Sequence, residues 1–335
     1  MKISASVYSG KGLELEALIK ELDAYRVDYF HIDCLDDIQV FDDIERIRRI
    51  SNTPIDLHLI CPRPDKYYPL IEKHQIENIT IQYEAIENGM SWPKNINLKF
   101  GLAISSQTPV DVFDKYEKNF SFVLFMATTP GISGGKFDKQ NFRKIREFRA
   151  KYPDKKIHVD GGINAELSFI LRNMGVYTVV VGSYLFKGPF IGSAMLNLKS
   201  DEIKSHYLVS DFMLEQDEIP VIQEKELTFE KALLKIDAYK MGFTNIAGDN
   251  QCLLGIITNA DIRKGLIHNL SDLNKINTSS LINRNPAYIY EDNTVSDALA
   301  YIKNLNFPVL FLPVINRQKQ ITGTIKFNNL IKGES

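Results

Sequence analysis

Three short stretches of the chain place histidine and aspartate side chains two residues apart within apolar runs. They are His31 and Asp33 in HID, Asp56 and His58 in DLH, and His158 and Asp160 in HVD. Side chains two residues apart on a β-strand point to the same face, so each pair would project together. Because an apolar pair would be less costly to bury, this pattern indicates a functional role for these groups.

Imidazole and carboxylate groups are the ligands that divalent transition metals take from proteins. We therefore expect His31, Asp33, His58 and Asp160 to bind one divalent ion, and zinc, iron, manganese and cobalt all accept this mixed set of donors. A single histidine on one strand is more often a hydrogen-bonded structural residue. Four such groups at the ends of three strands favour a metal site.

The elements that must position these residues recur regularly through the first 185 residues. Strand-like segments lie at residues 2–7, 27–33, 54–60, 78–83, 97–104, 121–127, 156–160 and 178–183. Amphipathic stretches such as 13–25 and 142–152 separate most of them. Eight alternating units predict an α/β protein with a (β/α)8 TIM barrel, whose active sites lie at the C-terminal ends of the strands. An open doubly wound sheet is the rival, which the lack of a glycine-rich first turn disfavours.

Glycines after the last two strands predict a phosphate site. Gly161 and Gly162 follow the seventh strand, and Gly182 and Ser183 end the eighth. Loops at these places commonly bind phosphate in TIM barrels, because glycine lets phosphate oxygens approach backbone N–H groups. Either pair alone would indicate only a turn.

The loop at residues 126–137, after the sixth strand, contains Gly131, Gly134 and Gly135 close to a proline. A mobile loop that closes over a ligand and an ordinary glycine-rich turn fit this composition equally well.

Composition excludes several classes of protein. The 335 residues include 40 basic and 42 acidic side chains, for a net charge of −2, and 44% are apolar. No basic excess points to nucleic acid or an anionic membrane, and no apolar stretch is long enough to span a bilayer. The three scattered cysteines, Cys34, Cys61 and Cys252, fit a reduced cytoplasm.

The pattern changes after residue 207, where two similar blocks follow at 227–266 and 293–331. Each is patterned as helix, strand, polar turn, strand and helix, which predicts two stacked copies of one small unit. We expect a barrel over residues 1–190, a linker over 191–207 and a smaller α+β domain over 208–335.

The first 190 residues resemble the ribulose-phosphate 3-epimerase family. The resemblance rests on SASVYS, HIDCLDD, DLHLI, MATTPGISGGKF, VDGGIN and VVVGSYLF, which occur in the order of the family's motifs. It implies that His31, Asp33, His58 and Asp160 bind the metal and that Ser6 contacts the substrate. It also implies that Asp33 and Asp160 exchange protons at C3 of a ketose phosphate through an enediolate.

The residues around this centre depart from the family. Ile60, Gln82 and Lys136 stand where methionine, histidine and glutamine are usual. The substrate therefore stays open between ribulose 5-phosphate and a related pentulose or hexulose phosphate.

The C-terminal blocks resemble a tandem pair of cystathionine-β-synthase (CBS) domains, also called a Bateman domain, of the kind fused to sugar-phosphate isomerases of surface-polysaccharide synthesis. LLGIITNADIRKGL carries the signature, and the resemblance implies that Thr258 and Asp261 contact a regulatory adenine or cytidine nucleotide. The second block has Lys326 and Asn329 at these positions. A dimerisation module without a ligand is the alternative.

These observations predict a cytoplasmic, homo-oligomeric, metal-dependent epimerase of a ketose phosphate with a nucleotide-responsive tail. An isomerase or lyase acting on a related phosphosugar is one alternative. The other is a catalytically inactive barrel that serves as a nucleotide sensor or scaffold.

Overall fold

The structure is a computed structural model that describes residues 1–335 except 88–98, 132–133, 189, 200–206, 306–309 and 327–335. The chain divides into two compact units, residues 1–202 and 203–335.

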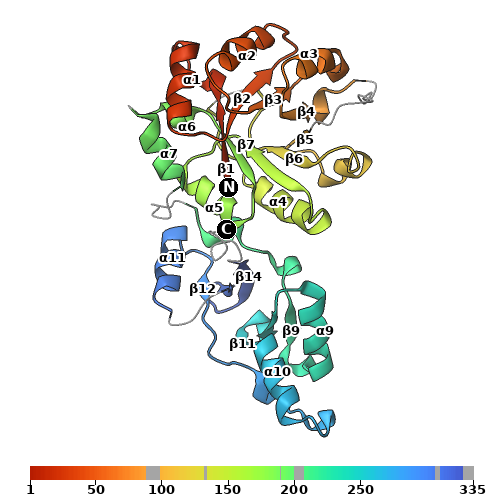
Figure 1. The fold of residues 1–335 in the computed structure, drawn as a ribbon. Helices are drawn as coiled ribbons and strands as arrows, with labels where there is room; N and C mark the ends of the chain where they lie inside the picture. The colour runs from red at the N-terminus through yellow and green to blue at the C-terminus, as the bar shows by residue number, and fades with distance from the viewer. Residues whose placement is uncertain (88–98, 132–133, 189, 200–206, 306–309, 327–335) are drawn as a thin grey trace. The chain divides into compact units, whose positions relative to one another are not determined.

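The first unit is built around a closed barrel of eight parallel strands (Figure 1). The strands are β1 (Lys2–Ser6), β2 (Tyr29–Cys34), β3 (Ile55–Leu59), β4 (Asn78–Gln82), β5 (Lys99–Ser105), β6 (Phe122–Met126), β7 (Lys156–Asp160) and β8 (Thr178–Val181). Each strand pairs with the next along the chain, and β8 pairs with β1. The predicted TIM barrel is confirmed, and the open doubly wound sheet is excluded.

Helices cover the outside of the barrel (Figure 1). They are α1 (Leu15–Ala24), α2 (Val40–Arg48), α3 (Tyr68–Lys73), α4 (Gln140–Lys151), α5 (Ala165–Asn173), α6 (Ser183–Phe186) and α7 (Ile191–Lys199). A 3-10 helix, Val110–Lys115, takes this place between β5 and β6. The amphipathic pattern explains their position, because α1 buries Leu18, Ile19 and Leu22 and leaves its charged residues in water.

Helix α7 occupies the first part of the segment expected to be a linker. It packs on α5, where Ser168 Oγ donates a 2.7 Å hydrogen bond to the carbonyl oxygen of Leu198. Residues 200–206 of the expected linker lie outside the described residues.

The interior of the barrel has a polar and an apolar part. The register between β2 and β3 sets His31 beside Asp56 and Asp33 beside His58. A buried apolar cluster of Ala103, Leu124, Met126 and Val180 fills part of the opposite wall, on β5, β6 and β8. The HID and DLH motifs therefore place four polar side chains next to one another on β2 and β3.

The second unit contains two three-stranded sheets with equivalent topology. The first repeat consists of β9 (Val221–Gln223), α9 (Phe229–Tyr239), β10 (Phe243–Ala247), β11 (Leu253–Thr258) and α10 (Asn259–His268). The second consists of β12 (Ile289–Tyr290), α11 (Val295–Lys303), β13 (Phe311–Ile315) and β14 (Ile321–Lys326), and the short α8 (Val209–Phe212) packs near β14. In each sheet a short strand runs parallel to the central strand, which forms an antiparallel hairpin with the third. The predicted internal repeat is confirmed, and the helix predicted at the end of the second copy lies outside the described residues.

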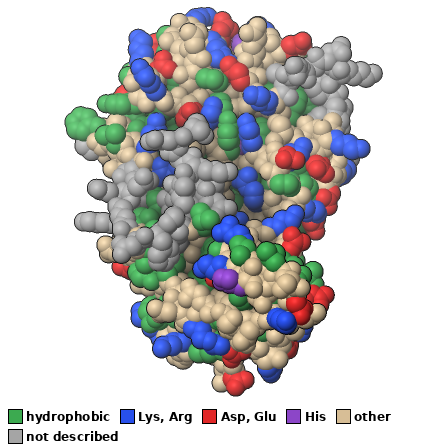
Figure 2. Space-filling model, turned by 60° about the horizontal axis from the view of Figure 1, so that its bottom comes forward, with side chains coloured by type: hydrophobic (Ala, Val, Ile, Leu, Met, Phe, Trp, Pro, Cys, Tyr) green, Lys and Arg blue, Asp and Glu red, His purple; other side chains and the backbone are tan. Residues whose placement is uncertain are grey.

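The surface carries charges of both signs. On the face drawn in Figure 2, Lys and Arg side chains are mixed with Asp and Glu side chains. In the described part of the chain, no helix combines the length and apolar character that crossing a membrane requires.

A substitution at Gly101 on β5 would test how tightly the barrel interior is packed. A Cβ atom at this position would lie 2.0 Å from Cε2 of Phe122, whose ring stacks on His158 with centroids 4.1 Å apart. We expect Gly101→Ala to lower the free energy of unfolding by about 1–3 kcal/mol, because overpacking forces side chains and backbone to shift. Urea denaturation measures this change. Gly188→Ala is the control, because its Cβ would meet no described atom within 4 Å; equal stability of the two variants would contradict the prediction.

Candidate functional site

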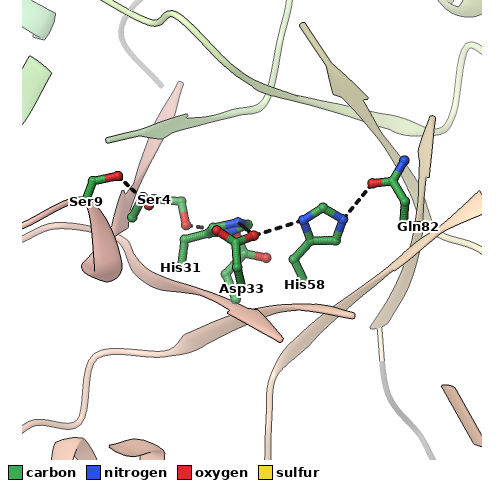
Figure 3. A network of polar contacts seen from close by, with 8 residues as sticks. Ser4, Ser9, His31, Asp33, His58 and Gln82 are labelled. Carbon is green, nitrogen blue, oxygen red and sulfur yellow. Dashed lines mark hydrogen bonds and ion pairs between the residues drawn. The ribbon is translucent and has the colours of Figure 1, made fainter. Parts of the chain in front are cut away.

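The carboxylate of Asp33 lies between two buried histidines at the C-terminal end of the barrel (Figure 3). Asp33 Oδ1 lies 3.3 Å from His31 Nε2 and 3.2 Å from His58 Nδ1. These three atoms lie within 4.8 Å of one another. Strand alternation and the register between β2 and β3 produce this convergence, because both pairs of side chains point into the barrel.

His31 is held from behind by a second carboxylate. Its Nδ1 atom lies 3.0 Å from Asp56 Oδ2, and Ser4 Oγ donates a 2.8 Å hydrogen bond to the same oxygen. Because a carboxylate only accepts, His31 Nδ1 must carry a proton and donate it. In neutral His31 the free electron pair is therefore on Nε2, which faces Asp33.

The donor set fits a divalent transition metal. His31 Nε2, Asp33 Oδ1 and His58 Nδ1 converge, while the other ring nitrogen of His58 lies 2.9 Å from Gln82 Oε1. Metal-bound histidines usually hydrogen-bond through the second ring nitrogen in this way, which orients the ring. A cation among the three atoms would relieve the repulsion between their electron pairs.

The charges of the site perturb its pKa values in opposite directions. Burial alone would lower the pKa of His31, but the Asp33 and Asp56 carboxylates outweigh burial and raise it well above its ordinary value. Burial opposes ionisation of Asp33 too, yet His31 and His58 hold the pKa of this carboxyl well below its usual range. The histidines thus place positive charge around Asp33. A bound metal ion would also supply positive charge there.

Asp160 ends β7 and occupies a different environment. Burial raises the pKa of its carboxyl group to about 6, with a further rise from Asp33 that the two histidines oppose. Among the described residues, the group whose ligand atoms converge within 4.8 Å contains His31, Asp33 and His58, and does not contain Asp160. Its place as a fourth ligand stays a prediction.

His158 lies one layer deeper on the same face of β7 and does not join the three converging residues. It is buried between Phe122 and Tyr177, and burial lowers the pKa of its imidazole to about 4.

The residues expected to bind phosphate lie at the ends of neighbouring strands. Gly161 and Gly162 follow β7, and Gly182 precedes α6, which begins at Ser183. Ser6 ends β1, one position beyond the paired residues Ala5 and Val181, so it lies beside Gly182. Closure of the barrel brings these groups together, and their role as a phosphate site stays a prediction.

Gly161 and Gly162 are also required by packing. They have φ angles of 113° and 69°, which side-chain-bearing residues rarely adopt. A Cβ at Gly161 would lie 2.7 Å from the backbone nitrogen of Thr128, and one at Gly162 would lie 2.4 Å from that of Phe137. The loops after β6 and β7 therefore contact each other through their backbones.

The glycine-rich loop after β6 contacts the wall of the site. A Cβ at Gly131 would lie 2.8 Å from Leu35 Cδ2, and one at Gly135 would lie 2.7 Å from Thr128 Cγ2. Gly131 and Gly134 have φ angles of 73° and 94°. Residues 132–133 of the expected ligand-covering loop lie outside the described residues.

In the second unit, Thr258 and Asp261 form a capping box at the start of α10. Asp261 Oδ2 accepts hydrogen bonds from the backbone nitrogen (3.0 Å) and from Oγ1 (2.6 Å) of Thr258. This contact explains the T-x-x-D spacing by local structure, and a nucleotide contact by these residues stays a prediction.

A cavity of about 470 Å³ lies next to this capping box, where the two repeats meet. Its lining comprises Leu233, Ile236, Asp237, Lys240, Met241, Gly242, Phe243, Asn259, Leu310, Phe311, Thr324 and Lys326. The rings of Phe243 and Phe311 stack with centroids 3.6 Å apart and planes at 3°. Thr258 and Asp261 are not among the lining residues, although Asn259 follows Thr258 directly.

Sequence reasoning missed the residues that support the histidines. Alternation placed Asp56 on the same face as His58, but its contact with His31 depends on the register between two strands. Ser4 and Gln82 are likewise inward-facing positions that alternation alone could have marked. Glu84, which accepts a hydrogen bond from Gln82 Nε2, follows β4 in the 3-10 helix Tyr83–Ala85 and has no such signal.

Comparison with known proteins identifies the barrel. Residues 2–186, more than half of the chain, match the ribulose-phosphate 3-epimerase family. The chain belongs to this family. The Bacillus subtilis ribulose-phosphate 3-epimerase is 28% identical over 200 residues, which cover 56% of this chain and 92% of that protein. The Methanocaldococcus jannaschii ribulose-phosphate 3-epimerase is 28% identical over 226 residues, which cover 64% of this chain and 95% of that protein.

The second unit carries CBS domains. Residues 279–334 match the CBS domain family. The crystal structure of the CBS-pair protein CBSX2 from Arabidopsis thaliana is 20% identical and covers 38% of this chain and 92% of that chain, with a TM-score of 0.32. The family match over residues 279–334 and the repeated sheet topology show that a CBS-pair-like α+β region follows the barrel.

Metal binding can be tested without measuring activity. If Asp33 is a ligand, a divalent ion at about 100 times its dissociation constant should stabilise the metal-free protein by about 2.7 kcal/mol, because the ion binds only the folded state. We expect Asp33→Asn to lose this stabilisation. Thermal unfolding with zinc, iron(II), manganese and cobalt measures it.

Asp36→Asn is the matched control, because Asp36 lies three residues further on and pairs with Lys66 at the surface. Equal metal-induced stabilisation of the two variants would show that Asp33 does not bind the ion.

Proposed function

We propose that the barrel is a metal-dependent epimerase that inverts C3 of a ketose phosphate. The observation that carries this proposal is the convergence of His31 Nε2, Asp33 Oδ1 and His58 Nδ1 at the carboxyl ends of β2 and β3. Membership of the ribulose-phosphate 3-epimerase family supports the reaction type.

Two carboxyl groups in different electrostatic environments are available for the proton transfers. His31, Asp33 and His58 would hold the metal, with Asp160 as the fourth ligand. When bound, the divalent cation supplies positive charge that stabilises the oxygen anion formed as the proton leaves C3. Asp33 and Asp160 would stand on opposite faces of the sugar, so that one removes the C3 proton and the other returns a proton on the far side.

The ends of β7, β8 and β1 would bind the phosphate group. Gly161, Gly162 and Gly182 present backbone N–H groups without side chains that obstruct them, and Ser183 and Ser6 add hydroxyl groups. Ribulose 5-phosphate and related pentulose or hexulose phosphates share this phosphate and the C2 carbonyl. An isomerase or lyase that acts on such a phosphosugar is the second candidate.

We also propose that the cavity between the two repeats binds a regulatory nucleotide. Lys240 and Lys326 would attract phosphate groups, and the half-buried ring of Phe311, stacked on the buried Phe243, offers an aromatic surface for a base. An adenine or cytidine nucleotide fits this combination of charges and rings. Self-association and a cytoplasmic location remain predictions, and the location agrees with three free cysteines.

Solvent exchange tests the barrel's reaction. In deuterated water with the metal supplied, we expect the protein to incorporate deuterium at C3 of ribulose 5-phosphate or of another ketose phosphate, as NMR and mass spectrometry would detect. Asp160→Asn should slow this exchange by about 10²- to 10⁴-fold, the usual contribution of an acid–base group. Asp154→Asn, in the exposed turn before β7, is the matched control and should exchange at the wild-type rate.

The product separates the candidates. An aldose with deuterium at C2, where a 1,2-enediolate takes up its new proton, would identify an isomerase, and shorter fragments would identify a lyase. Complete lack of exchange across pentulose and hexulose phosphates would leave the inactive scaffold.

Calorimetry on the full chain tests the nucleotide site. Titration with adenine and cytidine nucleotides, including nucleotide sugars, should reveal at least one ligand. Lys326→Met should weaken its binding about tenfold or more, because a charge-assisted hydrogen bond contributes about 1.5–3 kcal/mol. Lys264→Met, on the exposed face of α10, is the control. No binding across the panel would favour a dimerisation role.

A further inference from the structure

We propose that Gln82 and Glu84 are positioning residues that fix His58 with its Nδ1 atom toward the metal. This inference rests on the proposed function, because it assigns a role toward the metal that His31, Asp33 and His58 would bind. Neither Gln82 nor Glu84 is itself among the converging donor atoms. Their effect passes through the hydrogen bonds that lead from His58 to the rim of the barrel.

The first step fixes the orientation of the Gln82 amide. Glu84 Oε2 accepts a hydrogen bond from Gln82 Nε2. An ionised carboxylate can only accept, so the NH2 group of Gln82, and not its oxygen, must face Glu84. Gln82 Oε1 is then forced toward His58. Without Glu84, the two ends of this amide could exchange places.

The second step fixes the proton on His58. Gln82 Oε1 lies 2.9 Å from His58 Nε2, in a buried contact (Figure 3). An amide oxygen also only accepts, so the contact with Gln82 favours a proton on His58 Nε2, in competition with the Asp33 carboxylate at Nδ1. In neutral His58 the free electron pair is then on Nδ1, which lies 3.2 Å from Asp33 Oδ1. A flipped amide would present N–H groups to Nε2 and would move the proton to Nδ1, where it blocks metal binding.

The third step anchors Glu84, whose side chain is exposed at the rim. Glu84 Oε1 accepts a 2.8 Å hydrogen bond from the backbone nitrogen of Ser105 and another from Thr108 Oγ1. The carbonyl oxygen of the same Ser105 accepts a hydrogen bond from Lys144 Nζ on α4. Partial burial raises the pKa of Glu84, but the hydrogen bonds from Thr108, Ser105 and Gln82 outweigh it and hold the pKa below its ordinary value. The carboxylate therefore stays an acceptor.

The two histidines thus reach the same result by different routes. His31 donates from Nδ1 directly to the carboxylate of Asp56 and presents Nε2. His58 donates from Nε2 to an amide whose polarity is set by Glu84, and presents Nδ1. A histidine at position 82 could also donate to Glu84 with one nitrogen and accept from His58 with the other. Glutamine in place of the family's usual histidine at position 82 therefore keeps the direction of the hydrogen bonds from His58 to Glu84.

The test compares variants of the full chain by two measurements. The first is metal affinity, from competition with a chromophoric chelator. The second is the protonation of the His58 ring nitrogens, from the 15N NMR of histidine-labelled, metal-free protein at a pH where imidazole is neutral. We expect Gln82→Leu to lower metal affinity by about 10- to 100-fold, the usual effect of losing an outer hydrogen-bond partner. The proton on His58 Nε2 should then be shared with Nδ1.

Gln82→His should restore both measurements to within about threefold of wild type, because it keeps the donor and the acceptor. Glu84→Gln should give a metal affinity and a His58 protonation between those of Gln82→Leu and wild type, because a glutamine at position 84 no longer forces the orientation of the Gln82 amide. Ser106→Ala is the matched control, because it removes the hydrogen bonds that Ser106 Oγ donates to the Met126 carbonyl oxygen and accepts from Asn141 Nδ2, and neither involves Gln82 or Glu84. If Gln82→Leu does not fold, Glu84→Gln and Gln82→His still give the comparison.

Wild-type affinity together with an unchanged His58 spectrum in Gln82→Leu and Glu84→Gln would overturn the inference. Failure of the wild-type protein to bind any divalent metal would instead overturn the proposed function. The His58 spectrum of the metal-free protein separates these two failures, because it reports the proton position whether or not a metal binds.

Discussion

Three electron-pair donors face one another at the carboxyl ends of β2 and β3, and much of the barrel interior serves to hold them there. Asp33 Oδ1 lies within 3.3 Å of a ring nitrogen of His31 and of His58. Such groups repel one another unless a proton or a metal ion lies between them. The raised pKa of His31 corresponds to the first case, in which a proton between the groups supplies the positive charge. The divalent ion proposed for the site would supply the second.

Closure of the barrel limits what this polar cluster costs. Buried polar groups destabilise a fold unless they are hydrogen-bonded. His31 is hydrogen-bonded to Asp56, which accepts from Ser4, and His58 is hydrogen-bonded to Gln82, so the cluster extends across β1 to β4. An apolar cluster on β5, β6 and β8 fills another part of the interior, which packs densely. A side chain at Gly101 on β5 would collide with Phe122.

The CBS-pair region combines a symmetric fold with an asymmetric cavity. The two repeats share their sheet topology, and Phe243 stacks on Phe311 where they meet. The last residues of the two hairpins differ, because Thr258 in the first repeat corresponds to Lys326 in the second. Only Lys326 of these two lines the cavity. Sequence divergence between the repeats thus places the positive charge of Lys326 on one side of the cavity, where it could face an anionic ligand.

Local sequence patterns were enough to predict the barrel, the repeat and the convergence of His31, Asp33 and His58. Alternation and strand spacing carry this information locally, so HID and DLH could be recognised as inward-facing pairs. Tertiary structure decided which ring nitrogen of each histidine faces Asp33. That choice depends on partners from other strands and from a 3-10 helix, Asp56 for His31 and Gln82 with Glu84 for His58. Hydrogen-bond direction is a property of pairs of groups in space, and strand register and barrel closure, which set those pairs, have no local signal in the chain.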